Sequence, residues 1–167
     1  MKKELNIFLT AVMFYTRIPC PASIDHSGVM LNKATRYFPI IGWIVGGAVA
    51  AVYWLANYIV PLPISVLFSM AFGIMLTGAF HEDGFADVCD GFGGGYTKEA
   101  RLNIMKDSRI GTYGTVGLLL LLLTKFYLLT HLSVLALTLI MIVAHSVSRF
   151  VPVLVILRGE YARDDLT

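Results

Sequence analysis

The sequence predicts an all-α, multi-pass membrane protein, and three observations support that prediction. First, 57% of the 167 residues are hydrophobic and only 14% are charged, whereas soluble domains carry about 25% charged residues. Second, the apolar residues form long runs of the ~20 residues that a helix needs to cross a bilayer. Third, the mean hydropathy is +0.74. We expect a single membrane domain over residues 1–167, with about four spans as two helical hairpins plus an N-terminal interfacial helix.

The N-terminal segment has a basic start, Met1-Lys2-Lys3, and an apolar run from Leu5 to Tyr15. A secretory signal peptide would end in a small-residue cleavage site, but Arg17-Ile18-Pro19-Cys20-Pro21 stands there instead. The run is also too short to span a bilayer. We therefore predict an interfacial helix, in preference to an uncleaved, partly inserted segment.

The remaining apolar runs define the spans. Pro61-Leu62-Pro63 separates the first two and favours a tight hairpin. A second break is expected near Thr130-His131-Leu132-Ser133, with one longer helix as the alternative. The predicted spans are Tyr37–Val60, Leu62–Phe80, 113–130 and 132–157.

The charged residues predict the topology. Most of the 13 Lys and Arg residues lie before the first span, in the polar segment 81–112 and in the tail, and neither hairpin turn carries one. Positive charge marks the cytoplasmic side of a membrane. We expect a multi-pass protein of the cell (inner) membrane, with both termini and the polar segment in the cytoplasm. Thiols stay reduced there, so we expect no disulfide between Cys20 and Cys89.

An acidic motif, His81-Glu82-Asp83-Gly84-Phe85-Ala86-Asp87-Val88-Cys89-Asp90, opens the polar segment. If the second span continues as a helix, Asp83, Asp87 and Asp90 share one face. Like charges one turn apart repel, and a cation would compensate them. Oxygen ligands without a suitably spaced His or Cys favour Mg²⁺, Mn²⁺ or Ca²⁺, and Mg²⁺ commonly shares its coordination with substrate phosphates. Glu82, about 100° around the helix, is a weaker candidate ligand. A solvated acidic helix end is the alternative.

Two further segments could bind phosphate. Gly91–Gly95, interrupted only by Phe92, could bring backbone N–H groups of Gly93 and Gly94 close to phosphate oxygens, although such loops are often only flexible. The second segment follows, where Lys106 and Arg109 could neutralise a phosphate or anchor the chain by snorkelling. Asp107 and Ser108 lie between them.

Ionisable residues inside spans are functional candidates. Lys125 has no evident partner in the sequence, so snorkelling or pairing within the bundle is as reasonable as catalysis. His131 and His145 are expected to make polar contacts within the bundle. Arg149 could reach the cytoplasmic face and join the site.

Two long motifs resemble the signatures of the cobalamin synthase family, adenosylcobinamide-GDP ribazoletransferase. They are Thr77-Gly78-Ala79-Phe80-His81-Glu82-Asp83-Gly84-Phe85-Ala86-Asp87, continuing through Asp90-Gly91-Phe92-Gly93-Gly94, and Ile104-Met105-Lys106-Asp107-Ser108-Arg109-Ile110-Gly111-Thr112-Tyr113-Gly114. Shorter agreements are Phe14–Pro19, Arg36–Gly42 and His145–Arg149. The resemblance covers the whole chain and corresponds to about the N-terminal two-thirds of such proteins, so further membrane helices are expected beyond it.

The resemblance implies the last step of nucleotide-loop assembly in cobalamin biosynthesis. A hydroxyl of α-ribazole, or of its 5′-phosphate, attacks the phosphorus nearer cobinamide in adenosylcobinamide-GDP, and GMP leaves. On this view Asp83, Asp87 and Asp90, with Glu82 as a lesser ligand, hold Mg²⁺. Lys106, Arg109, Gly93, Gly94, Ser108 and Arg149 bind substrate, and Asp107 or Glu82 orients the attacking hydroxyl. A homo-oligomer is possible, and no nucleic-acid partner is expected.

Two other function classes are compatible with an acidic membrane protein. CDP-alcohol phosphotransferases also carry a carboxylate cluster, but Asp87 and Val88 stand where their pattern has Ala and Arg. A cation transporter should place its acids in the middle of a span. Here the acids follow the end of a span, which disfavours a transporter; a structural membrane scaffold is the remaining alternative.

Overall fold

The computed structural model of the chain describes residues 2–25 and 27–159, and within them every regular element is helical. The all-α prediction is confirmed. The helices are α1 Lys2–Tyr15, α2 Gly28–Ala34, the 3₁₀ helix η1 Thr35–Tyr37, α3 Phe38–Ala56, α4 Leu62–Thr77, α5 Phe80–Gly94, α6 Lys98–Ile104, α7 Thr112–Thr130 and α8 Val134–Arg158.

Three segments of the described chain are long and apolar enough to cross a membrane: Gly28–Ala56, Thr112–Thr130 and Val134–Arg158. A fourth crossing is possible if α4 and α5 together form one broken span. The predicted multi-pass bundle of about four spans is confirmed in this form. Both predicted breaks are present: Pro61 caps the N-terminus of α4, and the Ser133 hydroxyl accepts a hydrogen bond from Ala136 N (3.4 Å) at the start of α8.

The junction between α4 and α5 differs from the sequence-based expectation. The three aspartates were placed on one face on the condition that the span Leu62–Phe80 continues as a helix through the acidic motif, and this condition is not met. Gly78 (φ 65°) and Ala79 (φ 58°) both adopt the left-handed conformation, which ends α4 and bends the chain by 86°. The acidic motif therefore lies on a separate helix, which turns away from the direction of α4.

Helices α3 and α8 form the closest packed pair. A Cβ added at Gly46 would lie 2.7 Å from Met141 O and 2.8 Å from Ile142 Cα, so the two backbones nearly touch. Gly42 approaches the backbone of α8 at His145 in the same way, and Ser146 Oγ donates a hydrogen bond to Pro39 O (3.1 Å). Small residues at helix crossings are typical of membrane bundles, where close packing replaces the hydrophobic effect.

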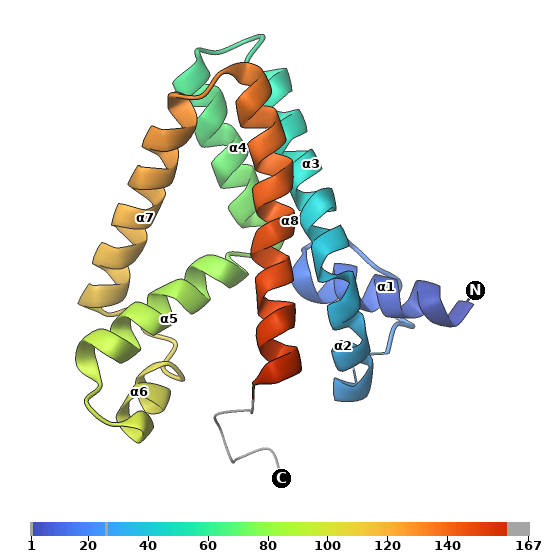
Figure 1. The fold of residues 1–167 in the computed structure, drawn as a ribbon, viewed down its shortest axis with the longest axis vertical. Helices are drawn as coiled ribbons and strands as arrows, with labels where there is room; N and C mark the ends of the chain where they lie inside the picture. Colours follow the sequence, from blue (N-terminus) through green and yellow to red (C-terminus); the bar gives the residue numbers. More distant parts are fainter. Residues whose placement is uncertain (1, 26, 160–167) are drawn as a thin grey trace.

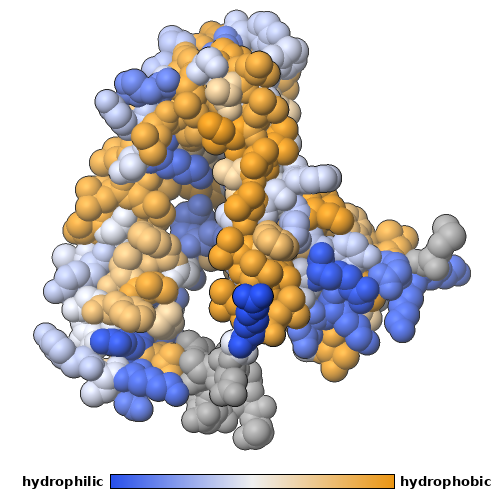
Figure 2. Space-filling view, in the orientation of Figure 1, coloured by the Kyte–Doolittle hydropathy of each residue, from blue (hydrophilic) through white to orange (hydrophobic). Residues whose placement is uncertain are grey.

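Helix α7 stands apart from α8 at its lower end, and α5 crosses beneath the space between them (Figure 1). The two hairpin turns lie at one end of the bundle, whereas α1, α5, α6 and the end of α8 lie toward the other. Figure 2 shows hydrophobic side chains over α7 and α8, with hydrophilic atoms recessed between them. This distribution suits helices that face lipid outside and a polar space inside.

The predicted N-terminal helix is confirmed as α1 and begins earlier than the apolar run, at Lys2. Ile7, Ala11 and Val12 are buried in the main core cluster, and Tyr15 stacks edge-on against Phe38 of α3. The helix is thus attached to the bundle, while its position at the membrane interface stays a prediction. Cys20 and Cys89 are both free, as expected.

Candidate active site

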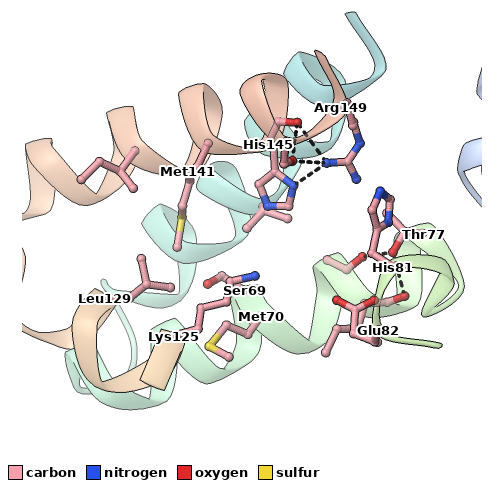
Figure 3. A pocket seen from close by; sticks show the side chains of 16 residues that line it. Ser69, Met70, Thr77, His81, Glu82, Lys125, Leu129, Met141, His145 and Arg149 are labelled. Atoms are coloured by element: carbon pink, nitrogen blue, oxygen red, sulfur yellow. Dashed lines mark hydrogen bonds between the residues drawn. The ribbon is translucent and has the colours of Figure 1, made fainter. Parts of the chain in front are cut away.

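A cavity of about 270 Å³ lies between α3, α4, α5, α7 and α8. Its apolar lining residues include Val49, Met70, Leu129 and Met141. Figure 3 shows Leu129 and Met141 toward one side of this space, and His81, Glu82 and Arg149 toward the other. Polar side chains of α4, α5, α7 and α8 line it, and Figure 3 shows the labelled ones around the same space. The polar and charged lining residues are Ser69, Thr77, His81, Glu82, Lys125, His145, Ser148 and Arg149.

Arg149 is the most buried of the charged residues in this pocket, with 5% of its surface exposed. Its Nη1 donates to His145 O (3.0 Å) and lies 3.1 Å from His145 Nδ1, one turn earlier on α8. This spacing of four residues places both side chains on one helix face. Its Nε is buried and has no hydrogen-bond partner, so a donor remains unsatisfied inside the pocket.

Glu82 enters the pocket from α5. Its Oε2 atom is also buried without a hydrogen-bond partner, and among the described residues no ion pair joins it to Lys125 or Arg149. The carboxylate nevertheless attracts both cations electrostatically. An unpaired buried acceptor and an unpaired buried donor each cost about 1–3 kcal/mol. A polar group bound in the pocket could pair both atoms and remove that cost.

The three aspartates of the acidic motif lie on one helix, as predicted, but they have different environments. Asp83 is exposed and Asp87 is partly buried. Asp90 instead accepts backbone hydrogen bonds from Gly111 N (2.7 Å) and Gly114 N (2.8 Å) at the start of α7. Both glycines leave room for that carboxylate, because a Cβ on either would collide with it. Asp90 thus fastens α5 to α7.

These side chains could supply only part of the coordination shell of a Mg²⁺ ion. In the described part of the chain, no three His, Cys, Asp or Glu side chains converge as they would in an all-protein metal cage. However, Mg²⁺ often uses only one or two carboxylates and completes its shell with water and substrate phosphate. Asp83 and Asp87, one turn apart on α5, provide such a pair. The metal role of the aspartates stays a prediction, and the geometry favours these two over Asp90.

Segment 106–109 does not line the pocket. Arg109 pairs with Asp107, with Nη2 2.6 Å from Oδ2, and Arg109 is exposed. Hydrogen bonds from Arg109 lower the pKa of Asp107 to about 2, which leaves its carboxylate a poor base. Lys106 and Ser108 are exposed. The substrate-binding roles of Lys106, Ser108 and Arg109 stay predictions, because phosphate would have to reach them from outside the pocket.

The glycine-rich segment is not an open loop, so that expectation is wrong. Gly91 to Gly94 form the last turn of α5, and Gly95 caps it. A Cβ on Gly93 would collide with the Tyr113 ring, and one on Gly91 would lie 2.8 Å from Met105 Cγ. These glycines allow α5 to pack closely against the segments that follow it. Phosphate binding by Gly93 and Gly94 stays a prediction, which amides inside a helix do not favour.

Comparison of the sequence with known proteins identifies the family of this chain. Residues 7–167 match the sequence profile of the cobalamin-5-phosphate synthases. The chain belongs to the cobalamin-5-phosphate synthase family. A relative from Shewanella sp. (strain ANA-3), named adenosylcobinamide-GDP ribazoletransferase, is 48% identical over 98% of this chain, and one of the same name from Shewanella amazonensis is 44% identical over 98%.

The chain spans 63% and 64% of the lengths of these two cobalamin-5-phosphate synthase relatives. No solved structure matches it. The resemblance inferred from the two long motifs is thereby confirmed at the level of the family.

Sequence reasoning missed part of the pocket of this family member. Glu82 and Arg149 are predicted site residues, whereas His81, Lys125 and His145 are not among them. Their signal was present, since ionisable residues in separate spans tend to face a shared interior. A sequence alone does not state which faces of α7 and α8 point toward each other.

The link between α5 and α7 in this family member can be tested at Asp90. We expect Asp90→Ala to destabilise the protein by about 2–3 kcal/mol, because it removes two charge-assisted hydrogen bonds at a helix N-terminus. Thermal unfolding of the detergent-solubilised protein should show a lower midpoint. Asp83→Ala is the matched control, since Asp83 lies on the same helix and is exposed. Equal midpoints for the two variants would contradict the fastening role.

Proposed function

We propose that this chain catalyses the Mg²⁺-dependent transfer of cobinamide phosphate from adenosylcobinamide-GDP to α-ribazole or its 5′-phosphate, releasing GMP. Family membership and the names of the relatives support this reaction. The placement of α5 is the observation that links this reaction to particular residues. This helix holds Glu82 inside the polar pocket and the aspartate pair on the neighbouring part of its surface.

Two sets of residues have separate roles in the proposed reaction. Asp83 and Asp87 would hold Mg²⁺ against the diphosphate of the donor. When bound, the cation neutralises charge that develops on the phosphate oxygens. Arg149 and Lys125 supply positive charge on the pocket side, where the buried guanidinium of Arg149 is well placed to stabilise charge on a phosphate.

Glu82 is the better candidate for orienting the attacking hydroxyl. Its unpaired Oε2 faces the pocket, whereas Asp107 is held by Arg109 with a pKa of about 2. In the proposed step, Glu82 accepts the hydroxyl proton as the oxygen bonds to the phosphorus nearer cobinamide. The bond from that phosphorus to the bridging oxygen breaks, and GMP leaves with that oxygen. A phosphodiester then joins the corrinoid to its nucleotide.

The proposed orientation places α5, α6 and both ends of the chain in the cytoplasm, at the inner membrane. The described charges support this orientation, because Lys98, Arg101, Lys106 and Arg109 belong to α6 and the loop after it, at the end of the bundle opposite the two hairpin turns. A cytoplasmic site would be open to soluble corrinoid and nucleotide substrates. Labelling of a cysteine introduced in the Pro61–Pro63 turn should then require access from outside the cell.

The direct test is an assay of membranes that contain this chain, supplied with adenosylcobinamide-GDP, α-ribazole and Mg²⁺. We expect GMP release together with formation of the cobalamin product, and loss of both when EDTA removes the metal. A reaction without α-ribazole separates transfer from hydrolysis. GMP release that is independent of the acceptor would contradict the proposed transfer.

A further inference from the structure

The segment Phe14–Pro19, at the end of α1, is a shared motif that the proposed reaction does not use, and none of its residues lines the pocket. The Thr16 hydroxyl donates to Val12 O (2.6 Å) and accepts a hydrogen bond from Ile18 N (3.2 Å). Thr16 is buried, so these two bonds fix a tight turn directly after α1. The next residue, Arg17, is thereby separated from α1 and contacts another helix.

Arg17 contacts the C-terminal end of α4 with both its backbone and its side chain. Its N–H donates to Leu76 O (2.7 Å), a carbonyl in the last turn of α4. A Cβ on Gly78 would lie 3.1 Å from Arg17 Cζ and Nη2 and closer still to Nε, so the guanidinium rests on that glycine. In the described part of the chain, no hydrogen bond or ion pair draws this side chain elsewhere. A cation is favourable at a helix C-terminus, where the carbonyl groups carry partial negative charge.

The same segment also contacts the beginning of α5. The rings of Phe14 and Tyr15 each lie 5.9 Å from the ring of Phe80, the first residue of α5, with their edges toward it. Tyr15 is in turn held against Phe38 of α3, with 3.9 Å between the ring centroids. Figure 1 shows the C-terminal end of α1 close to the point where α4 meets α5. The segment therefore contacts both sides of the bend between these two helices.

The bend is a place where such contacts matter. Ala79 adopts a left-handed conformation (φ 58°), which is unfavourable for a residue with a side chain and persists only where surrounding contacts impose it. Asp90 fixes the far end of α5 through its hydrogen bonds to the start of α7. The near end carries Glu82 and Asp83, and Arg17 lies at the bend that precedes them. The contacts at the bend thus complement those of Asp90.

We propose that Arg17 is a positioning residue for the transfer reaction. Together with the two aromatic rings, it fixes the angle between α4 and α5, and this angle determines where Glu82 and Asp83 lie. Glu82 follows Gly78 by four residues, so a change in the bend moves its carboxylate directly. A displacement of about 1 Å at a reacting group can lower a rate by about 10²-fold. The inference rests on the proposed function, because it adds a residue that supports the groups of that reaction without touching substrate.

Kinetics of Arg17 variants test this role. Arg17→Met removes the charge and keeps an unbranched chain, and we expect it to lower kcat for GMP release at least about tenfold. The KM for adenosylcobinamide-GDP should change by less than about twofold, because Arg17 does not bind the donor. Arg17→Lys restores a cation at the end of α4 and should recover most of kcat. Arg36→Met is the matched control, since it removes the same charge from η1, where Arg36 pairs with Glu4.

Two kinetic outcomes would overturn the proposal. An unchanged kcat in Arg17→Met would show that the angle of α5 does not depend on this side chain. A raised KM for adenosylcobinamide-GDP with an unchanged kcat would show that Arg17 binds the donor directly.

Gly78→Ala tests the same contact from the other side. The new methyl group would take the place of Arg17 Nε, so the guanidinium must move although Arg17 itself is intact. We expect a loss of kcat like that of Arg17→Met, and a double variant that loses less than the product of the two single losses. The left-handed φ of Gly78 adds strain that also lowers the thermal midpoint, so the rates are compared well below the lowest midpoint. Fully multiplicative losses would mean that the two residues act independently, contrary to the proposal.

A distance measurement that needs no activity separates this inference from the proposed function. In a chain whose two cysteines are replaced by serine, spin labels would be attached at Ile59→Cys, before α4, and Tyr96→Cys, after α5. These side chains are 84% and 94% exposed. In phosphatidylcholine nanodiscs, pulsed electron-spin spectroscopy should give a distance distribution that shifts or broadens in Arg17→Met and not in Arg36→Met. Identical distributions in the two variants would overturn the positioning role even if GMP is released. A shift in Arg17→Met, in a chain that shows no acceptor-dependent GMP release, would refute the proposed function and leave the control of the bend standing.

Discussion

Asp83→Asn and Asp87→Asn should each lower Mg²⁺-dependent GMP release by about 10²-fold or more. Each substitution removes one negative oxygen from the pair that we propose to hold the cation against the diphosphate. Removing a single group that stabilises charge in a transition state commonly costs 10²–10³-fold in rate. The loss should be partly recovered at higher Mg²⁺ concentration, because a weaker metal site is refilled by mass action.

The control for these variants is Glu99→Gln on α6, an exposed acid in the same polar segment and outside the pocket. Its turnover should match that of the unaltered chain. Thermal midpoints for Asp83→Asn should also be unchanged, since the side chain is exposed. Full turnover in both aspartate variants at limiting Mg²⁺ would exclude the pair as metal ligands.

Gly46→Ala is expected to destabilise the bundle by about 1–3 kcal/mol or more. The new methyl carbon would lie 2.7 Å from Met141 O and 2.8 Å from Ile142 Cα. These are backbone atoms of α8, so no side-chain rotation relieves the overlap, and α3 must move away from α8. Because Met141, His145 and Arg149 all belong to α8, the same shift should distort the pocket.

At the neighbouring residue, we expect Gly47→Ala to have the opposite effect on stability. A Cβ on Gly47 meets no atom within 4 Å, and alanine is favoured over glycine in a helix by up to about 1 kcal/mol. We therefore expect a lower thermal midpoint for Gly46→Ala and an equal or higher one for Gly47→Ala, measured in the same detergent. Similar losses in both variants would show that α3 and α8 do not depend on this contact.

Membership of the family determines how far the expected effects of these substitutions apply to related chains. The two long motifs that identify it lie on α5 and across the start of α7, and Asp90 joins them through Gly111 and Gly114. The motifs are thus adjacent in space as well as specific in sequence. A substitution in one motif can act through the other, so stability and activity have to be measured together for each variant.

The sequence by itself determined the helical spans, the two hairpin breaks and the acidic motif. These features follow from local physical chemistry: hydropathy sets which segments enter the bilayer, proline prevents a helix from continuing, and helical periodicity puts Asp83 and Asp87 one turn apart. The same local information includes Gly78, a residue type that commonly ends a helix, but it does not include the left-handed conformation of Ala79. Nothing in an alanine signals a left-handed conformation that only the surrounding packing imposes.

Tertiary structure alone decided which of the candidate residues form the site. It placed Glu82, Lys125 and Arg149 in one pocket, used Asp90 to hold α7, and paired Asp107 with Arg109 outside it. Each outcome depends on how helices distant in sequence approach one another. Close glycine contacts between α3 and α8 and between α5 and α7 set that approach, and the rotation of each helix follows from it. A single sequence shows where the glycines are, but it does not show which helix packs against each of them.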